Sequence, residues 1–574
     1  MNKRTIKRAF QYVGKYKGLV ILSIILSLIS VLLSLYVPIL IGNAIDYVIG
    51  ENNVDLKSVL SKIGLAVFIT IVGAILQWVY GVINNHITYR VAKDVREAAF
   101  NRIQQLPLKY LDTHPTGETV SRIIADTDEF TDGLLMGFTQ FFTGIVTILT
   151  TLIFMLCLNW RVTIAVVVLT PLSLVIASFI AKRTYGMFTK QSETKGEQTA
   201  YIDEMIGGLK VVKAFSYNDD AISKFSEIND RLESHSLKAI FFSSLTNPCT
   251  RFVNSVVYAF VAFLGAILVP GSLSVGGLTI FLSYANQYTK PFNEISGVVS
   301  EMQSALACAQ RVFDLIEETP QTPDGLSKLN DASGHIVIND VSFCYTPEKP
   351  LIQNLSLDIK PGMRVAIVGP TGCGKTTLIN LLMRFYDVNC GDIIVDNQSI
   401  YSITRNSLRE NIGMVLQETW LYAGTIEENI KFGKEDATEE EVIAAAKAAH
   451  AHNFIKRLPQ GYKTVIEEDG GSLSQGQKQL LCIARIMLKS PPMLILDEAT
   501  SSIDTNTEQH IQDAFMKLMK GRTSFIVAHR LSTIQTADLI LVMRDGNIIE
   551  KGNHQELINT GGFYKELYES QFAK

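Results

Sequence analysis

The chain has 574 residues, of which 47% are hydrophobic, and its formal net charge is −4. It is too long for one hydrophobic core, so two or more domains are expected. The near-neutral charge gives no reason to expect nucleic acid as a partner. The seven cysteines form neither a Cys-x-x-Cys pair nor a cluster with histidine, which argues against a disulfide framework and against a cysteine metal site.

The first half of the chain carries six apolar stretches of roughly the 20 residues that a helix needs to cross a bilayer. Taken singly, each could be a buried core helix, but six in one half predict a transmembrane domain. The sixth is the weakest, because polar residues 286–288 and Lys290-Pro291 interrupt it. The stretches are residues 18–41, 63–82, 134–158, 162–180, 252–269 and 275–298.

Lysine and arginine are distributed unevenly around these stretches. The N-terminal segment and the long connections after the second and fourth stretches are basic, whereas the short connections are poor in cations. Cytoplasmic loops of membrane proteins carry the excess of positive charge. The pattern predicts a multi-pass protein of the cell membrane, in contact with the lipid bilayer, with both termini cytoplasmic.

The two long connections differ from solvated loops, because apolar positions continue through them. In the first, residues 114–118 are expected to break the helix, which restarts over 119–128. In the second, residues 206–208 are expected to interrupt it before a short segment, 209–215. Helices that project beyond the bilayer and end in short crosspieces would be levers able to contact a cytoplasmic domain.

Thr and Pro accumulate after Glu317, and beyond them strand-like and helical runs alternate, as in an α/β nucleotide-binding domain. The predicted fold is thus an α-helical transmembrane domain of six helices with long cytoplasmic extensions, followed by an α/β P-loop domain. The predicted boundaries are 1–318 for the membrane domain, 319–333 for a linker and 334–574 for the nucleotide domain.

The clearest motif lies between an apolar run at 364–368 and a helical run from residue 377. It fits G-x-x-x-x-G-K-[ST], the loop whose backbone N–H groups cradle phosphates at a helix N-terminus. Lys375 would reach the β- and γ-phosphates, and the Thr376 hydroxyl would bind Mg²⁺. The residues predicted to bind ATP are Gly369, Pro370, Thr371, Gly372, Cys373, Gly374, Lys375, Thr376 and Thr377.

Other candidate residues follow apolar strands. Asp497 and Glu498 close the run 493–496, where Asp497 suits Mg²⁺ and Glu498 suits the general base that activates water. A helix N-cap is the alternative for this pair. Gln417 follows the strand 412–416 and could contact Mg²⁺ and water. His529 follows 524–528 and could reach the γ-phosphate. Tyr345 could stack on adenine, although core packing is nearly as good an explanation.

A second anion-binding helix start is formed by Ser474, Gln475, Gly476 and Gln477. A chain that already has one phosphate loop has no evident use for a second anion-binding helix start on the same nucleotide. The segment therefore indicates an active site shared with another chain, with an ordinary helix N-cap as the alternative.

Together with the phosphate loop, these motifs resemble the full set of an ATP-binding cassette. With the membrane stretches ahead of them, the chain resembles a half-transporter of the multidrug and lipid exporter type, over nearly its whole length. The resemblance implies two cassettes that enclose two ATP molecules and Mg²⁺, with each signature loop capping the partner's nucleotide. It also implies that Asp504 lies in the loop between the two sites.

One position departs from the family pattern, which is usually Leu-Ser-Gly-Gly-Gln. Here Gln475 replaces the first glycine, and a side chain where backbone approaches a phosphate weakens the cap. An altered signature beside an intact Glu498 resembles one half of an asymmetric heterodimer, so a second, different half-transporter is favoured as partner over a homodimer. Separately, a thiol at a helix N-terminus is often reactive, so alkylation of Cys373 is expected to inactivate the protein unless ATP protects it.

The predicted function is ATP-hydrolysing export of a small amphipathic or apolar compound by alternating access as a dimer. An ATP-gated channel or membrane sensor is the alternative, which the intact Glu498 and His529 make less favourable. Few charges lie in the apolar stretches, which favours an uncharged substrate cavity. Six residues of these stretches could line such a cavity, although helix–helix packing explains them equally well. These are Asn254, Tyr258, Phe281, Asn286, Gln287 and Tyr288.

Overall fold

The computed structural model describes residues 3–48, 54–268, 274–416, 419–467, 470–471, 473–497, 504–527 and 534–572. The chain divides into two compact units. The first unit comprises Met1–Leu106 and His114–Thr319, and the second comprises Pro107–Thr113 and Pro320–Lys574. The short segment from residue 107 to 113 therefore packs with the C-terminal half, although it follows a membrane helix in sequence.

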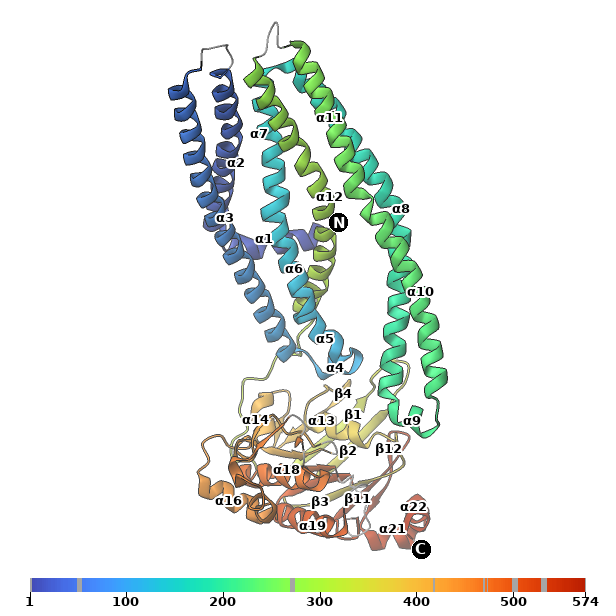
Figure 1. Ribbon diagram of the computed structural model, residues 1–574. Helices are drawn as coiled ribbons and strands as arrows, with labels where there is room; N and C mark the ends of the chain where they lie inside the picture. Colours follow the sequence, from blue (N-terminus) through green and yellow to red (C-terminus); the bar gives the residue numbers. More distant parts are fainter. Residues whose placement is uncertain are drawn as a thin grey trace. The chain divides into compact units, whose positions relative to one another are not determined.

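The described part of the first unit is helical (Figure 1). Its elements are α1 (Lys3–Gly14), α2 (Lys17–Asp46), α3 (Leu56–Gln105), α5 (Thr116–Ile123), α6 (Ala125–Met136), the π-helix η1 (Gly137–Phe142), α7 (Thr143–Leu158), α8 (Trp160–Gly207), α9 (Leu209–Ala214), α10 (Asn218–Ser244), α11 (Thr246–Leu268) and α12 (Val275–Glu317).

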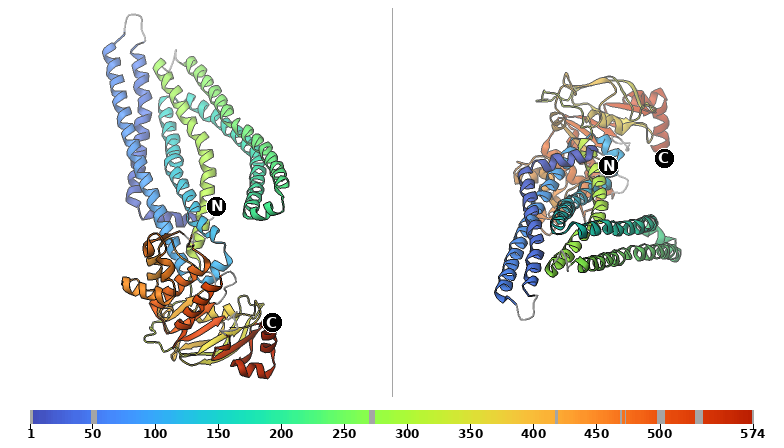
Figure 2. Two further views of the ribbon diagram at one scale, coloured as in Figure 1. Left: turned by 60° about the horizontal axis from the view of Figure 1, so that its bottom comes forward. Right: turned by 90° about the horizontal axis from the view of Figure 1, so that it is seen from above.

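Four helical stretches among the described residues are long and apolar enough to cross a membrane: Lys17–Asp46, Leu56–Gln105, Thr116–Leu158 and Asn218–Ile267. The count of six stays a prediction. α3 has 50 residues and is therefore about 75 Å long, well beyond the thickness of a bilayer core of about 30 Å. Figures 1 and 2 show α2 beside α3, and α8 beside α10, as long pairs. The predicted projecting helices are present.

The helix breaks differ in part from those predicted. α3 ends at Gln105 because Leu106 is extended, with φ −74° and ψ 147°, ahead of Pro107. Proline disfavours helical geometry in the residue before it, so the prediction missed a break that the sequence contains. The short helix α4 (Leu108–Thr113) follows, and α5 starts at Thr116 rather than at residue 119. The second interruption is as predicted, with α9 starting at Leu209.

Two further differences lie in the apolar stretches. The third stretch contains the π-helix η1 between α6 and α7, which no periodicity argument anticipated. α12 runs without a break through Lys290-Pro291, although these residues interrupt the apolar stretch and made it the weakest candidate in the sequence. Proline is tolerated in membrane helices because neighbouring helices and local adjustments satisfy the backbone groups that it frees.

Packing of the first unit centres on Leu35, Met155, Val166, Val257 and Tyr284, one residue each from α2, α7, α8, α11 and α12. The Tyr284 hydroxyl donates to the Leu35 carbonyl oxygen at 2.6 Å, which ties α12 to α2. At the other end of α12, Arg4 and Arg8 of α1 both pair with Glu317.

The second unit is an α/β domain together with α4. Its strands are β1 (Ile336–Phe343), β2 (Ile352–Ile359), β3 (Arg364–Val368), β4 (Cys390–Val395), β5 (Gln398–Ser399), β6 (Ile412–Val415), β7 (Gly424–Thr425), β8 (Val465–Ile466), β9 (Met493–Asp497), β10 (Thr523–Val527), β11 (Leu539–Arg544) and β12 (Asn547–Gly552). Its other helices are α13 (Lys375–Leu382), α14 (Arg405–Glu410), α15 (Ile426–Lys431), α16 (Glu439–Ala448), α17 (His452–Ile455), the 3₁₀ helix η2 (Gly461–Lys463), α18 (Gln475–Lys489), α19 (Thr505–Met519), α21 (His554–Thr560) and α22 (Phe563–Phe572).

The main sheet has the order β12-β11-β3-β10-β9-β6 and is parallel except for β12. A second, antiparallel sheet has the order β2-β1-β4-β5. Alternate residues of the central strands face opposite layers. For example, Ala366 belongs to the core with α18 and α19, whereas Val365 and Ile367 belong to the core with α13 and the antiparallel sheet. Both faces of β3 are thus buried, which holds the loop after it in place.

Candidate nucleotide site and family

The predicted phosphate loop connects β3 to α13. α13 begins at Lys375, directly after Gly374, whose φ of 100° is rarely accessible to residues with a side chain. The first N–H groups of the helix then face the loop and can bind an anion. Lys375 Nζ donates to the carbonyl oxygens of Gly369 and Pro370, each at 2.9 Å, so the ammonium lies over the loop. The strand, loop and helix that the motif requires are present.

Glycine is required at position 369 because the loop approaches the backbone of β11. A Cβ atom at Gly369 would lie 2.2 Å from the carbonyl oxygen of Met543 and 2.8 Å from Cys373 Sγ. The Cys373 side chain itself is 3% exposed. A reagent would therefore reach this thiol only after the loop moves, and the expected inactivation by alkylation remains a prediction.

Four parallel strands end level with one another beside this loop. Val527 at the end of β10 pairs with Asp497 of β9 and with Ile367 of β3, and Val415 of β6 pairs with Leu496 of β9. Ligands of open α/β sheets bind outside the carboxyl ends of the parallel strands. The Asp497 carboxylate is therefore at the ligand-binding edge of the sheet.

Three predicted catalytic residues lie outside the described residues: Gln417, Glu498 and His529. Each follows a described strand end by one or two positions in the sequence, after Val415, Asp497 and Val527 respectively. Their assignment rests on that sequence relation and stays a prediction.

Tyr345 takes part in an aromatic cluster beside the loop. Its ring is perpendicular to those of Phe343 and Tyr386, with centroid distances of 4.9 and 5.0 Å. Its hydroxyl donates to Thr377 Oγ1 at 3.2 Å, so it is anchored to the first turn of α13. The side chain is 37% exposed, which leaves surface for a base to stack on. Packing and adenine binding are thus compatible for this residue.

The signature segment starts α18 with a reciprocal cap. Ser474 Oγ accepts from the Gln477 N–H at 3.3 Å, and Gln477 Oε1 accepts from the Ser474 N–H at 3.0 Å. The N-cap explanation is therefore correct for the local structure. It does not compete with the partner-site role, because Ser474 acts as acceptor in the cap and its O–H stays available to donate. Ser474 and Gln475 are exposed, and Gly476 is buried.

The side chain at the departing position has a partner in its own chain. Gln475 Nε2 donates to Thr419 Oγ1 at 3.2 Å, in the segment that follows Gln417. Thr419 was not singled out from the sequence, and no motif marks it. The contact suggests that Gln475 links the signature segment to the loop after β6.

Asp504 is the N-cap of α19, where its side chain accepts from the Thr507 N–H at 2.9 Å. This hydrogen bond, with the Thr507 side chain, lowers the pKa of the Asp504 carboxyl from its usual value. Asp504 is exposed, so capping α19 is compatible with its predicted place in the loop between the two ATP sites.

The residues predicted for Mg²⁺ suit that ion. Thr376 supplies an exposed hydroxyl in the first turn of α13, and Asp497 supplies a carboxylate at the same sheet edge. Mg²⁺ usually takes one or two protein oxygens together with phosphates, rather than a cage of side chains. The described residues contain no group of three His, Cys, Asp or Glu able to hold a metal.

The crosspiece helix α4 contains residues that sequence reasoning missed. Tyr110 is buried in the second unit at 7% exposure. Asp112 accepts a hydrogen bond from the Tyr386 hydroxyl, and Tyr386 in turn packs on Tyr345. Burial and the Asp112 carboxylate raise the pKa of Tyr386. The polar and aromatic residues of α4 carry no motif, so only the fold identifies them.

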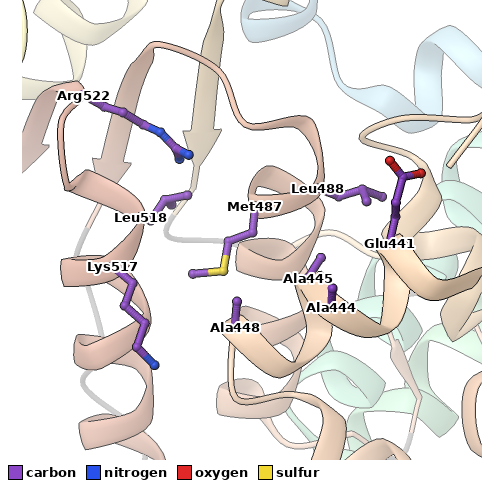
Figure 3. Close-up of a pocket in the computed structure, with 9 residues that line it drawn as sticks. All are labelled: Glu441, Ala444, Ala445, Ala448, Met487, Leu488, Lys517, Leu518 and Arg522. Atoms are coloured by element: carbon purple, nitrogen blue, oxygen red, sulfur yellow. The ribbon is translucent and has the colours of Figure 1, made fainter. Parts of the chain in front are cut away.

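A separate cavity of about 410 Å³ lies among α16, α18 and α19 (Figure 3). Figure 3 shows the Met487 side chain near the alanines of α16, with Lys517 and Arg522 on the opposite side. Arg522 Nη2 donates to Ser490 Oγ at 2.8 Å. None of the predicted nucleotide residues lines this cavity, so it is not the nucleotide site.

Two family models match the chain, one for each unit. Residues 20–292 match the ABC transporter transmembrane region, and residues 352–501 match the ABC transporter model. The chain is 40% identical over 521 residues to a fatty acid ABC transporter ATP-binding/permease protein of Mycobacterium bovis, covering 91% of this chain and 83% of that protein. It is 36% identical to a putative multidrug export ATP-binding/permease protein of Staphylococcus aureus, covering 99% and 100% of the two chains.

Among solved structures, a bacterial Atm1-family ABC exporter with ATP bound superposes with a TM-score of 0.78. The two sequences are 27% identical, and the match covers 100% of both chains. Fold, motifs and relatives agree along the whole chain. The protein therefore belongs to the ABC transporter family, as a multi-pass membrane exporter whose ATP-binding domain is an ATPase coupled to transport.

Proposed function

We propose that this chain exports a small amphipathic or apolar compound from the cytoplasm by alternating access, as one half of a dimer. The observation that carries the proposal is that β3, β6, β9 and β10 end level with one another beside the phosphate loop. The other unit of the same chain contains long apolar helices.

In the proposed cycle, Lys375 and Thr376 hold the triphosphate and its Mg²⁺, with Asp497 as second metal contact. Glu498 activates the attacking water as general base, while Gln417 and His529 orient water and γ-phosphate. ATP drives the membrane helices only if it binds the two conformations with different affinity.

A chain of contacts supports coupling between α4 and the nucleotide loop. Asp112 bonds Tyr386, the Tyr386 ring packs on Tyr345, and Tyr345 bonds Thr377 in the first turn of α13. A change in the position of α13 on ATP binding would thus reach α4 through three successive side-chain contacts. Substitutions of Asp112 and Tyr386 should therefore change the coupling between ATP hydrolysis and transport.

The second crosspiece supports a dimer. Helix α9 and its flanks expose Ile206, Val211 and Phe215, at 67%, 61% and 81%. Apolar side chains gathered on a cytoplasmic helix end indicate a protein partner. A second subunit would supply one, and the signature segment would then cap the partner's ATP. Because Gln475 departs from the family pattern, a heterodimer with a different half-transporter is favoured.

The test compares ATP hydrolysis and uphill transport in lipid vesicles for the native chain and for Glu498→Gln, alone and with a co-expressed neighbouring half-transporter. Loss of a general base should slow hydrolysis by about 10²–10⁴-fold while ATP still binds. Glu440→Gln, at an exposed position in the first turn of α16, is the control and should leave the rate unchanged.

The outcomes separate the alternatives. Hydrolysis without uphill movement would favour a channel or sensor. Full activity of the lone chain would refute the heterodimer, and an unchanged rate in Glu498→Gln would remove this residue from the role of general base.

A further inference from the structure

We infer that the membrane unit binds its substrate through a polar, uncharged group that carries several hydroxyl or amide functions. This inference rests on the proposed transport function and specifies the chemistry of its substrate. It narrows the expectation of an amphipathic or apolar compound, which was based on the scarcity of charges in the apolar stretches, by excluding a wholly apolar one.

The site is a cavity of about 370 Å³ between α2, α3, η1–α7 and α12. Its size is within the range of about 300–1,000 Å³ that small-molecule sites occupy. Of the sixteen described residues that line it, only Val31, Leu35, Gly144 and Pro291 lack a polar side chain. Such a lining is unusual in a bilayer, where polar groups are costly unless they have a partner.

The polar residues form two matching helix faces. On α2, Ser27, Ser30 and Ser34 follow each other at spacings of three and four residues, which places them on one face. Thr139, Thr143 and Thr147 are spaced by four along η1 and α7. The two faces meet where Ser27 Oγ lies 3.3 Å from Thr143 Oγ1. The π-helix η1 widens the turn that carries Thr139 and Gln140, and such turns are frequent at functional sites.

The depth of the cavity follows from a contact between the ends of α2 and α12. Asp46 Oδ1 accepts from the Gly276 N–H at 2.7 Å, so these helix ends are level. Ser34 is twelve residues from Asp46, and Lys290 is fourteen from Gly276, or about 18 and 21 Å along the helices. With those ends at the membrane surface, the cavity lies within the hydrocarbon core of about 30 Å.

Several lining side chains have unused hydrogen-bonding capacity. Thr139 and Thr147 donate to the carbonyl oxygens of Leu135 and Thr143 at 2.7 and 2.8 Å. Five others form no hydrogen bond to a described residue: Ser30, Ser34, Gln77, Gln140 and Gln287. An apolar ligand would leave these groups dehydrated and unpaired, at a cost for each one. A ligand rich in donors and acceptors would satisfy them.

The charges of the lining favour a ligand without net charge. Lys290 and Glu294, one turn apart on α12, pair at 3.8 Å, and the other described lining residues are uncharged. A charged ligand would have to compete with this pair. In contrast, a second cavity between α11 and α12 is lined by Arg251 and, among the described residues, by no acidic side chain. Asn254 also lines it, and its Oδ1 has no hydrogen-bond partner among the described residues.

The two cavities also account for residues that the sequence left undecided. Gln287 lines the cavity proposed here, whereas Asn254, Tyr258 and Asn286 line the second one. Phe281 and Tyr288 are buried by packing, at 0% and 6% exposure.

The test is photolabelling of the full-length protein in lipid nanodiscs, without nucleotide. Four dodecyl amphiphiles carry a diazirine next to the headgroup, which is maltoside, phosphocholine, carboxylate or trimethylammonium. Mass spectrometry maps the labelled peptides. The maltoside should label the α2 and α12 segments of the cavity, and excess unlabelled maltoside should suppress this labelling. The other three should label only lipid-facing positions, without competition.

Gln140→Leu and Gln287→Leu, which keep side-chain volume, should each weaken this competition by roughly threefold to tenfold, the value of one hydrogen bond. Ser283→Ala is the control, because Ser283 is on α12 but lines neither cavity. Elution as a single species and binding of a fluorescent ATP analogue report that each variant is folded.

The inference would be overturned if the phosphocholine, carboxylate or trimethylammonium probe labelled the cavity and its unlabelled form suppressed that labelling. It would also be overturned if the maltoside labelled the Arg251 segment in the same way. Labelling needs no ATP, so the two proposals fail separately. Cavity labelling without ATP-driven transport would refute the exporter function alone, and transport without cavity labelling would refute this inference alone.

Discussion

The phosphate loop and the membrane cavity are built in opposite ways. The loop consists of eight consecutive residues, 369–376, and a loop of this kind binds phosphate mainly through backbone N–H groups. The cavity consists of side chains from helices far apart in the sequence, between Ser27 and Glu294. A backbone site is damaged by added atoms, whereas a side-chain site is altered by removing polar groups. The same fold can therefore keep its ATP chemistry while its substrate changes.

The largest effect is expected at Gly369. In Gly369→Ala, the new Cβ would lie 2.2 Å from the Met543 carbonyl oxygen, so the loop must move away from β11. Overpacking of this kind costs about 1–3 kcal/mol, which corresponds to a loss of about fivefold to 150-fold in affinity for a fluorescent ATP analogue. Gly372→Ala is the control, since nothing lies within 4 Å of its Cβ and only its positive φ is strained. If both variants lost the same affinity for the ATP analogue, strain from the positive φ, and not the contact with Met543, would be the cause.

A second substitution tests whether the membrane unit also depends on close backbone approach. In Gly276→Ala, the Cβ would lie 2.0 Å from the Gly42 carbonyl oxygen and 2.6 Å from the Asp46 carboxylate. We expect a destabilisation of about 1–3 kcal/mol, measured as a lower unfolding temperature in detergent. Gly64→Ala, with open space around its Cβ on α3, should be neutral or stabilising. If the two variants behave alike, the close contact of α2 and α12 is not needed.

A smaller effect is expected where α4 contacts the nucleotide unit. Tyr386→Phe and Asp112→Asn each weaken the hydrogen bond between them. Because Asp112 is exposed and Tyr386 is only half-buried, we expect only about a fivefold loss of transport per ATP hydrolysed, near 1 kcal/mol. The double variant should lose little more than either single one, because both changes weaken the same bond. Tyr422→Phe removes a hydroxyl that does not bond Asp112 and serves as control. Additive losses would argue against the proposed path.

The smallest effect concerns Asp504. Its pKa in the folded protein is lowered by the Thr507 N–H, so the cap stabilises fully at neutral pH. That contribution to stability decreases once the pH falls below about 3.9, the pKa of an aspartate in the unfolded chain. It is lost when the pH has also passed the lower pKa of Asp504 in the folded protein. Asp504→Asn caps the helix equally well without titrating. Unfolding temperatures of the full chain between neutral pH and pH 3 should therefore fall less in Asp504→Asn. Parallel curves would show that the carboxylate does not contribute.

Features carried by neighbouring residues could be predicted from the amino-acid sequence. The phosphate loop needs Gly369, Gly374 and Lys375 at fixed spacing, and the cap of α18 needs Ser474 and Gln477 three apart. Apolar length predicted the membrane stretches, and the glycines before Leu209 predicted the second crosspiece. The break before α4 was also readable, from Pro107, but was missed.

Contacts between distant elements had to come from the tertiary structure. Helical spacing shows that Ser27, Ser30 and Ser34 share one face of α2, but not that this face meets the threonines of α7. Likewise, nothing local indicates that Asp112 reaches Tyr386 or that Gln475 reaches Thr419. The physical reason is that periodicity defines the faces of one element, whereas the pairing of faces depends on the packing of the whole chain.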